Sequence, residues 1–303
     1  MSSLAKKMIV AFDTSAVATV RILLPLLPRG MARFAGSIFG AMGLAVSPER
    51  RKRAFDNLKN VLHGLPRKEL KKICRECFIQ SGAGFAEVFH MQHKKPQYLQ
   101  KIVDFEGLDK VREAAKKKKG VIIVGSHLSA FPLGMMAMAS LGFRVSVLVR
   151  QADNARVEEM SESIRRRFDL SSIYVKPRRE AASACLRWLR EGGILWMLVD
   201  QRYRKGILTN FLGKPSQVAP GAALFARRVG APLIPAVTIR RPDSKYRVII
   251  GEEIELPDGI GRRNNVKSDM EKILGSIEKY ILAYPRQWTW FHKMWKVRKE
   301  ALD

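Results

Sequence analysis

Gly120-Val-Ile-Ile-Val-Gly-Ser-His127-Leu-Ser-Ala-Phe-Pro132-Leu-Gly134 is the stretch around which the rest of the chain is organised. An apolar run (121–124) precedes a Gly-Ser break, one histidine and a segment rich in Met and Ala that continues to Leu141. This order predicts a buried strand, a tight loop and a helix. His127 would then lie at the carboxyl end of a strand and beside a helix N-terminus, where open α/β sheets place their chemistry. A histidine that merely caps the helix fits the same spacing.

Apolar runs and amphipathic segments alternate on both sides of this stretch. The pattern predicts an α/β fold with a mainly parallel central sheet flanked by helices. The expected strands are 101–106, 121–124, 144–149, 172–175, 193–199, 233–239 and 246–253. The expected helices are 108–118, 155–168, 179–190, 221–229 and 268–283, and 202–220 is expected to be a loop.

The first hundred residues have a different pattern, which predicts helices only, so we expect a helical region over 1–100 and an α/β domain over 101–303. Residues 8–27 are apolar but include Asp13 and Arg21, and 34–48 are charge-free but short and glycine-rich. Neither provides the roughly 20 uninterrupted apolar residues of a spanning helix. Flanking Lys and Arg side chains favour a helix that lies in a membrane interface, and two ordinary core helices are the alternative.

Composition restricts the class of partner. The chain has 303 residues, of which 47% are apolar, enough for a full core, and its net charge is +27. A charge of this size favours anionic partners: nucleic acid, anionic lipid, phosphorylated ligands or an acidic carrier protein. The basic residues are spread through helices without interleaved aromatics, and no nucleic-acid reader motif is present, which disfavours nucleic acid.

Three cysteines do not make a disulfide framework and indicate a reducing compartment. Cys74-x2-Cys77 followed by His90-x2-His93 approaches a zinc-finger spacing. The histidine gap is one residue too short, and the intervening residues indicate an apolar helix and not a hairpin. We therefore expect no metal site.

His127, Arg150 and Asp200 each follow the carboxyl end of an expected parallel strand. Such ends can converge at one edge of the sheet. A base, a cation and a carboxylate there suit attack on a carbonyl or on a phosphate-bearing ligand. In the alternative interpretation Asp200 caps a loop and Arg150 is merely solvated.

The chain resembles the bacterial lipid A lauroyl/myristoyl acyltransferases of the glycerolipid-acyltransferase superfamily. The resemblance extends from the N-terminal apolar segment to Arg298. The order and spacing of many short motifs carry the resemblance. They are Asn57-Leu-Lys, Glu87, Gly125-Ser-His127, Arg150-x3-Asn154, Leu198-Val-Asp200-Gln201, Phe211-Leu-Gly213-Lys-Pro215, Ala219-Pro-Gly221, Gly230-Ala-Pro-Leu-Ile-Pro235 and Pro285-x2-Trp288-Thr-Trp290-x-His292-x2-Trp295.

The resemblance implies a membrane-associated acyltransferase on the cytoplasmic face of a bacterial inner membrane. In that family a histidine takes the proton from an acceptor hydroxyl, which attacks an acyl-carrier-protein or coenzyme A thioester; the thioester is a co-substrate, and no other cofactor is expected. His127 and Asp200 are the catalytic candidates. The substrate-binding candidates are Ser129, Arg150, Asn154, Arg166, Gln201, Phe211, Gly213, Pro215, Pro220 and Gly221.

One position departs from the family pattern. The family carries Glu or Asp five residues after the histidine, as the partner that orients the ring, and this chain carries Pro132. Proline fits a first helical turn, but it can neither orient an imidazole nor balance its charge. Asp200 could replace the carboxylate from a neighbouring strand, Ser129 could fix the ring, or a more reactive acceptor such as an amine could need a weaker base. The alternative is a catalytically degenerate, lipid-binding relative.

Overall fold

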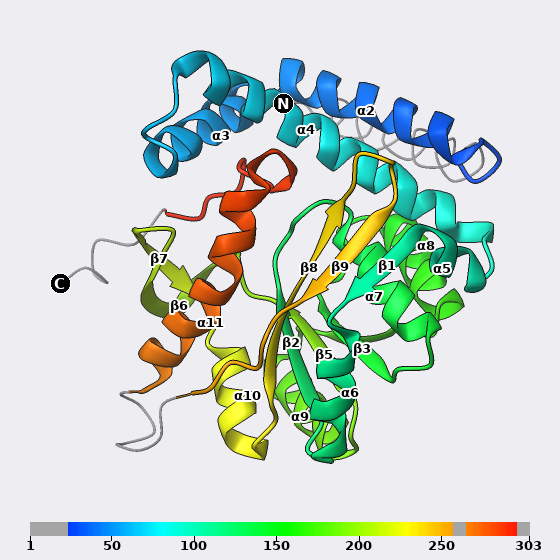
Figure 1. The fold of residues 1–303 in the computed structure, drawn as a ribbon, viewed down its shortest axis with the longest axis vertical. Coiled ribbons are helices and arrows are strands. Elements are labelled where there is room, and N and C mark those ends of the chain that lie inside the picture. Colours follow the sequence, from blue (N-terminus) through cyan, green and yellow to red (C-terminus); the bar gives the residue numbers. More distant parts are fainter. Residues whose placement is uncertain (1–23, 257–264, 296–303) are drawn as a thin grey trace, which may run out of the picture.

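The computed structural model describes residues 24–256 and 265–295, and its centre is a seven-stranded sheet with strand order β1-β9-β8-β2-β5-β3-β4 (Figure 1). These strands are β1 (Val103–Glu106), β2 (Val121–Gly125), β3 (Val145–Val149), β4 (Ser171–Tyr174), β5 (Ile194–Leu198), β8 (Leu233–Arg240) and β9 (Tyr246–Ile250). All neighbouring pairs are parallel except the β8–β9 hairpin. The predicted α/β fold with a mainly parallel sheet is confirmed.

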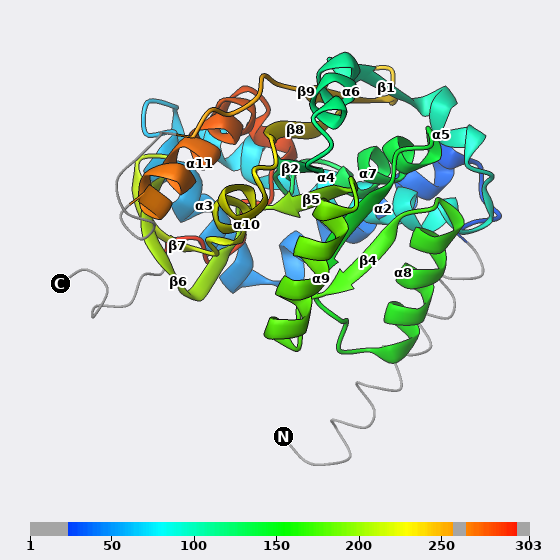
Figure 2. The same cartoon turned by 90° about the horizontal axis from the view of Figure 1, so that it is seen from below.

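Helices cover both faces of this sheet. On one face lie α5 (Gln97–Ile102), α6 (Leu108–Lys116), α7 (Phe131–Ser140) and α8 (Ala155–Arg167); on the other lie α9 (Arg178–Arg190), α10 (Gly221–Val229) and α11 (Asn265–Ala283). Alternate side chains of β2 point to opposite faces of the sheet. Ile122 and Val124 pack in the core that contains α9, α10 and α11, whereas Val121 and Ile123 pack in the core that contains α5 to α8. Figure 2 shows β4 at the sheet edge with α8 and α9 on opposite sides.

Three N-terminal helices lie across the end of the sheet at which β2 terminates (Figure 1). They are α2 (Arg29–Val46), α3 (Pro48–Val61) and α4 (Arg67–His90). Glycines bring α2 and α4 into direct backbone contact: a Cβ on Gly40 would lie 2.3 Å from the Phe78 carbonyl oxygen, and one on Gly82 would lie 2.3 Å from the Gly36 oxygen. At its other face α4 meets the loop after β2, where a Cβ on Gly84 would lie 3.2 Å from the Ala130 Cβ.

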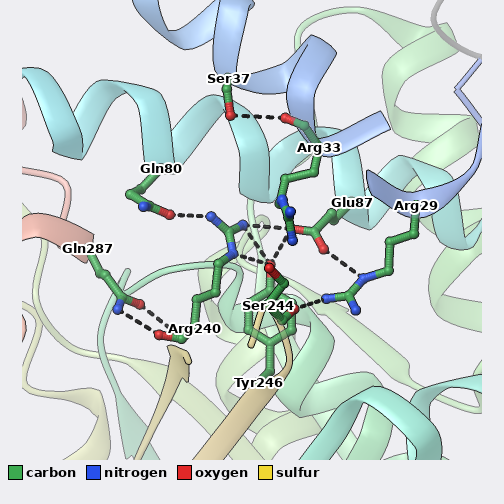
Figure 3. A network of polar contacts seen from close by, with 9 residues as sticks. All are labelled: Arg29, Arg33, Ser37, Gln80, Glu87, Arg240, Ser244, Tyr246 and Gln287. Atoms are coloured by element: carbon green, nitrogen blue, oxygen red, sulfur yellow. Dashed lines mark hydrogen bonds and ion pairs between the residues drawn. The ribbon is translucent and has the colours of Figure 1, made fainter. Parts of the chain in front are cut away.

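A buried polar network fastens these helices to the sheet (Figure 3). Glu87 of α4 is fully buried and accepts hydrogen bonds from Arg29 Nε at 2.8 Å, Arg240 at 2.6 Å and the Tyr246 hydroxyl at 2.5 Å. Arg240 also donates to Gln80 of α4. A buried carboxylate needs such partners, and Glu87 thereby joins α2, α4, β8 and β9.

Residues 202–220, expected to be a loop, instead form a two-stranded antiparallel ribbon of β6 (Arg202–Phe211) and β7 (Lys214–Val218). The prediction was wrong because Leu212 and Gly213, both at positive φ (51° and 74°), make the tight turn that matches strand twist. Tertiary packing supports the ribbon: Trp295 Nε1 donates to the Phe211 carbonyl, and the Leu212 N–H donates to Glu278 of α11.

In the described part of the first hundred residues the elements are helices, α2 to α5 and one 3-10 turn (Met91–His93), whereas most of the apolar segment 8–27 lies outside the described residues. The division into a helical region over 1–100 and an α/β domain over 101–303 stays a prediction. Within residues 24–256 and 265–295, no helix combines the length and the apolar character that spanning a bilayer requires.

Candidate active site

Strand pairing places His127 beside Asp200. Strands β2 and β5 run parallel with Gly125 opposite Leu198, and each candidate residue lies two positions beyond that pair. The ladder continues through a hydrogen bond from the Val199 N–H to the Gly125 carbonyl. The register of two neighbouring parallel strands thus brings the two side chains to one edge of the sheet.

Asp200 holds His127 with both of its carboxylate oxygens. Oδ1 lies 2.7 Å from His127 Nδ1, and Oδ2 accepts the His127 backbone N–H at 2.7 Å. The same Oδ2 accepts the indole N–H of Trp288 at 2.7 Å. With Nδ1–H donated to the carboxylate, the free lone pair of the ring is on Nε2, the arrangement that a general base requires.

The charge of His127 and hydrogen bonds, and not burial, decide the charge state of Asp200. The Asp200 side chain is 1% exposed, whereas that of His127 is 19% exposed. Burial raises the pKa of Asp200, but the positive charge on His127 and the hydrogen bonds from His127 and Trp288 outweigh it, so that pKa lies below its usual value. Asp200 is therefore ionised at neutral pH and can stabilise an imidazolium.

The C-terminal segment folds over the loop that carries His127. Leu128 forms an antiparallel bridge with Trp288, and the Ser129 N–H donates to the Gln287 carbonyl at 2.8 Å. The Gln287 side chain bonds both backbone groups of Arg240 on β8. Because Ser129 has a φ of 53°, its loop is a strained turn, and these contacts hold it in place.

On the open side of the ring, His127 Nε2 lies 3.0 Å from Gln201 Nε2. The ring of His292 is 5.9 Å from that of His127, centre to centre, and its Nε2 is 3.5 Å from the same Gln201 nitrogen. Burial lowers the pKa of His292 to about 4. The positive charges of His127, Arg50 and Arg53 also lower this pKa, whereas the negative charge of Asp200 raises it. His292 is therefore neutral at pH 7.

Two cavities adjoin each other here, one of them lined in part by Gln201 and His292. A polar one of about 380 Å³ is lined by Arg50, Arg53, Gln201, Arg202, Phe291, His292 and Lys293. An apolar one of about 320 Å³ lies between α2 and α4, with Gly36, Phe39, Gly40, Phe78 and Phe85 in its wall. Arg50 and Phe291 line both. The two cavities thus form adjoining apolar and cationic compartments.

The structure brings only part of the predicted site together. His127, Asp200 and Gln201 are in contact. The Ser129 hydroxyl is buried but has no hydrogen-bond partner among the described residues, so it does not fix the ring. Position 132 is in the first turn of α7, as expected for proline.

The second predicted block lies elsewhere. Arg150 is exposed, pairs with Asp153 at 3.1 Å, and lines a separate cavity of about 220 Å³ with Tyr174 and Lys176. Asn154 caps α8 by accepting the backbone N–H groups of Arg156 and Val157, and Arg166 is exposed on that helix. Substrate binding by these residues stays a prediction.

The remaining candidates shape the ribbon and α10. Phe211 is buried against Trp288, with ring centres 6.0 Å apart, and Gly213 makes the β6–β7 turn. Pro215 is exposed on β7. Pro220 and Gly221 begin α10, where a Cβ on Gly221 would lie 3.2 Å from the Met197 methyl. A role of these residues in substrate binding stays a prediction.

The zinc-like spacing has a structural explanation. Cys74 and Cys77 are buried in α4, where Cys77 donates to the Cys74 carbonyl, and His90 bonds the Leu24 carbonyl. Among the residues that the structure describes, no group of three His, Cys, Asp or Glu side chains could hold a metal ion.

Sequence reasoning missed the part played by the C-terminal segment and by α3. Trp288 and His292 stood in a motif of the resemblance, but nothing in their spacing indicated that they contact Asp200 and Gln201. Asn57 Nδ2 donates to the carbonyls of Trp290 and His292, at 2.7 and 3.1 Å. Only the Asn57-Leu-Lys motif in the basic helix could have signalled this contact.

The chain is similar to known proteins over nearly its whole length. Residues 3–297 match the family described as bacterial lipid A biosynthesis acyltransferase. The chain is 28% identical over 277 residues to the lipid A biosynthesis palmitoleoyltransferase of Escherichia coli (strain K12), covering 90% of this chain and 87% of that protein. It is 24% identical over 272 residues to the lauroyltransferase of the same organism, covering 88% and 86%. A solved 1-acyl-sn-glycerophosphate acyltransferase, PlsC, from Thermotoga maritima aligns with 11% identity and a TM-score of 0.41, over 86% of this chain and 99% of that one.

Proposed function

This chain belongs to the bacterial lipid A biosynthesis acyltransferase family, and we propose that it transfers a fatty acyl chain from a thioester donor to a hydroxyl of a lipid acceptor with His127 as general base. The observation that carries the proposal is the pairing of His127 Nδ1 with the buried Asp200 carboxylate at 2.7 Å. This pairing supplies the carboxylate that position 132 lacks. It therefore favours catalysis over the degenerate lipid-binding alternative.

The chemistry follows from the free Nε2 of His127. This nitrogen takes the proton of the acceptor hydroxyl while the oxygen attacks the thioester carbonyl carbon, forming a tetrahedral intermediate. The C–S bond then breaks, and the imidazolium returns its proton to the departing thiolate. The products are the acylated lipid and a free thiol. Asp200 stays ionised throughout and stabilises the imidazolium.

Gln201 occupies the place where the acceptor must bind. Its amide nitrogen lies 3.0 Å from His127 Nε2, at hydrogen-bond distance. An acceptor hydroxyl that uses this lone pair must displace the amide. Once displaced, the amide remains close enough to bond the incoming substrate, so we assign Gln201 a role in positioning the acceptor.

The adjoining cavities suit the two ends of an amphiphile. The apolar cavity between α2 and α4 is lined by glycines and phenylalanines and provides a binding region for a fatty acyl chain. The thioester donor in our proposal is acyl-carrier protein or acyl coenzyme A, with no other cofactor. The acidic surface of a carrier protein would complement the net charge of +27.

We also propose that α2 lies in the interface of an anionic membrane. Its large apolar side chains point outward: Met31, Phe34, Ile38 and Met42 are 46–68% exposed and follow one helical stripe. Gly36 and Gly40 instead face α4. A soluble helix has the opposite arrangement. Exposed cations at the start of α3 (50–52) follow directly and complement anionic headgroups. We place the protein as a peripheral or monotopic enzyme on the cytoplasmic face of a bacterial inner membrane.

Acyl transfer is tested with purified protein, radiolabelled acyl-carrier protein or acyl coenzyme A, and an extract of bacterial lipids as acceptor. We expect His127→Ala to lower the rate by at least about 100-fold, the usual contribution of general-base catalysis. His93 is exposed in the same fold and serves as the matched control, since His93→Ala should leave the rate unchanged. Equal transfer by wild type and His127→Ala would contradict the proposal.

Membrane association is tested by flotation with vesicles of phosphatidylethanolamine and phosphatidylglycerol. Exchanging Phe34 and Ile38 for Gln should reduce binding by about tenfold or more, because each side chain buries apolar area in the interface. Leu282 of α11 is exposed to the same 46% as Ile38, and Leu282→Gln is the control. Undiminished flotation of the exchanged variant would contradict the membrane proposal. Self-association of the wild type in solution that the same exchanges abolish would instead assign the α2 surface to a contact between two copies of the chain.

A further inference from the structure

We propose that the cationic cavity beside His127 is a phosphate-binding subsite that anchors a phosphorylated substrate. The cavity is the one of about 380 Å³ lined by Arg50, Arg53, Arg202 and Lys293 together with Gln201, Phe291 and His292. Its use by a substrate rests on the proposed acyl transfer, whereas its affinity for phosphate does not.

Four cations from separate parts of the chain converge here. Arg50 and Arg53 come from α3, Arg202 begins β6, and Lys293 belongs to the C-terminal segment. None of the described residues that line the cavity is acidic, and within residues 24–256 and 265–295 none of the four forms an ion pair with a carboxylate. Gathering like charges without a counter-charge is unfavourable. A bound anion would remove that repulsion.

Arg202 points to the ligand most directly. Its Nε is buried and has no hydrogen-bond partner among the described residues. Buried donors almost always have an acceptor, so this one signals a group that binds there. A guanidinium presents donors in a planar fork that matches two oxygens of a phosphate. Arg202, which lines the cavity, can therefore present its guanidinium to a phosphate there.

The rest of the cavity is built to a fixed shape. Arg53 donates to the Phe291 carbonyl at 3.1 Å, and Asn57 on the same helix bonds the carbonyls of Trp290 and His292. These contacts tie the C-terminal wall of the cavity to α3. Arg50 is exposed and also lines the apolar cavity, so it lies where an anionic head would meet an acyl chain.

Proximity to His127 connects the subsite with the reaction. Gln201 lines the cavity and has its amide 3.0 Å from His127 Nε2. A phosphate held here would fix the reacting end of its molecule beside the base. The phosphate can belong to the head of the acceptor lipid or to the carrier arm of the thioester donor. Both present the same tetrahedral anion.

Binding is measured by calorimetry with inorganic phosphate and with pyrophosphate at low ionic strength. We expect Arg202→Gln and Arg50→Gln each to weaken affinity about tenfold or more, as is usual for losing a charged hydrogen-bond donor. Arg202→Lys should retain part of it. Arg190, exposed at the end of α9, provides the charge-matched control, Arg190→Gln. Figure 1 shows α9 at the other end of the molecule from α3. Equal affinity in Arg190→Gln, Arg202→Gln and Arg50→Gln would overturn the proposal.

Kinetics identify the source of the phosphate. If it belongs to the donor, Arg202→Gln should raise KM about tenfold for acyl coenzyme A but leave KM for acyl-pantetheine, which lacks phosphate, unchanged. If it belongs to the acceptor, the penalty should vanish with a dephosphorylated lipid. A penalty that persists when both substrates lack phosphate would refute the subsite. Absence of transfer by the wild type would refute the proposed function, while calorimetry would still decide whether phosphate binds.

Discussion

Replacing Asp200 by Asn is the sharpest test of the base. In the wild type, Oδ2 accepts two N–H groups, from the His127 backbone and the Trp288 indole, while Oδ1 faces His127 Nδ1. An asparagine keeps both N–H bonds only if its carbonyl oxygen takes the Oδ2 position. Its NH2 group must then face Nδ1, which forces the imidazole proton onto Nε2. The ring thereby loses the lone pair that would accept the substrate proton.

The expected result is a large loss of kcat with little change in stability. Replacing the orienting Asp of a Ser-His-Asp triad by Asn costs about 10,000-fold by the same tautomer effect, so we expect a loss of about 1,000- to 10,000-fold here. Asp200→Ala differs, because it leaves both N–H groups buried without an acceptor. Each such group costs about 1–3 kcal/mol of folding free energy.

Steady-state transfer rates and urea unfolding of both variants separate these effects. Asp109, exposed in the first turn of α6, provides a control of the same chemistry in Asp109→Asn. The tautomer explanation fails if Asp200→Asn retains near-native kcat, or if its loss of activity merely follows a loss of folded protein.

Three further predictions use the same structure. Pro132→Glu restores the carboxylate of the family pattern and should recover at least about tenfold of the activity lost in Asp200→Asn; no recovery would mean that position 132 cannot reach the ring. His292 should lower the free energy of unfolding by about 3 kcal/mol as the pH falls from 6.5 to 4. In that pH range the unfolded state binds a proton at His292, whereas the folded state, in which the pKa of His292 is about 4, does not. Urea titrations of His292→Gln should lack that part of the pH dependence. Gly40→Ala should destabilise the protein by about 1–3 kcal/mol, since its Cβ would lie 2.3 Å from the Phe78 carbonyl oxygen, whereas Gly43→Ala, with its nearest neighbour at 4.0 Å, should not.

The fold could be predicted from sequence to the extent that its signals are local. The apolar runs of β2 and β5 are continuous, as strands buried on both faces must be, and the carboxyl-end rule placed His127 and Asp200 at the same edge. That they are neighbours could not be known, because β5 pairs with β2 although β3 and β4 come between them in the chain. Strand order depends on the packing of helices against both faces.

The rest of the site lacks a local signal. The ribbon formed by 202–218 contains Gly206, Gly213 and Pro215, which favour turns, and contacts with α11 and Trp295 stabilise it as strands. Arg50 belongs to a run of cations that equally suits a solvated helix face. Arg50 lines both cavities only because α3 packs against the C-terminal segment, a contact between distant parts of the chain.

The proline at position 132 changes the electrostatics of the site as well as its dyad. Asp200 contributes one negative charge that is fully engaged with His127 and Trp288, so the adjoining cavity keeps the unbalanced charge of its four cations. A carboxylate at 132 would follow Phe131, whose ring lies 4.9 Å from that of His127, and would add a second negative charge to the surroundings of the histidine. Pro132→Glu should therefore weaken phosphate binding even while it supports the base, and calorimetry on this variant separates the two effects. A carboxylate just after β5 and a proline in α7 thus serve both requirements, a correctly oriented base and a cavity that attracts an anion.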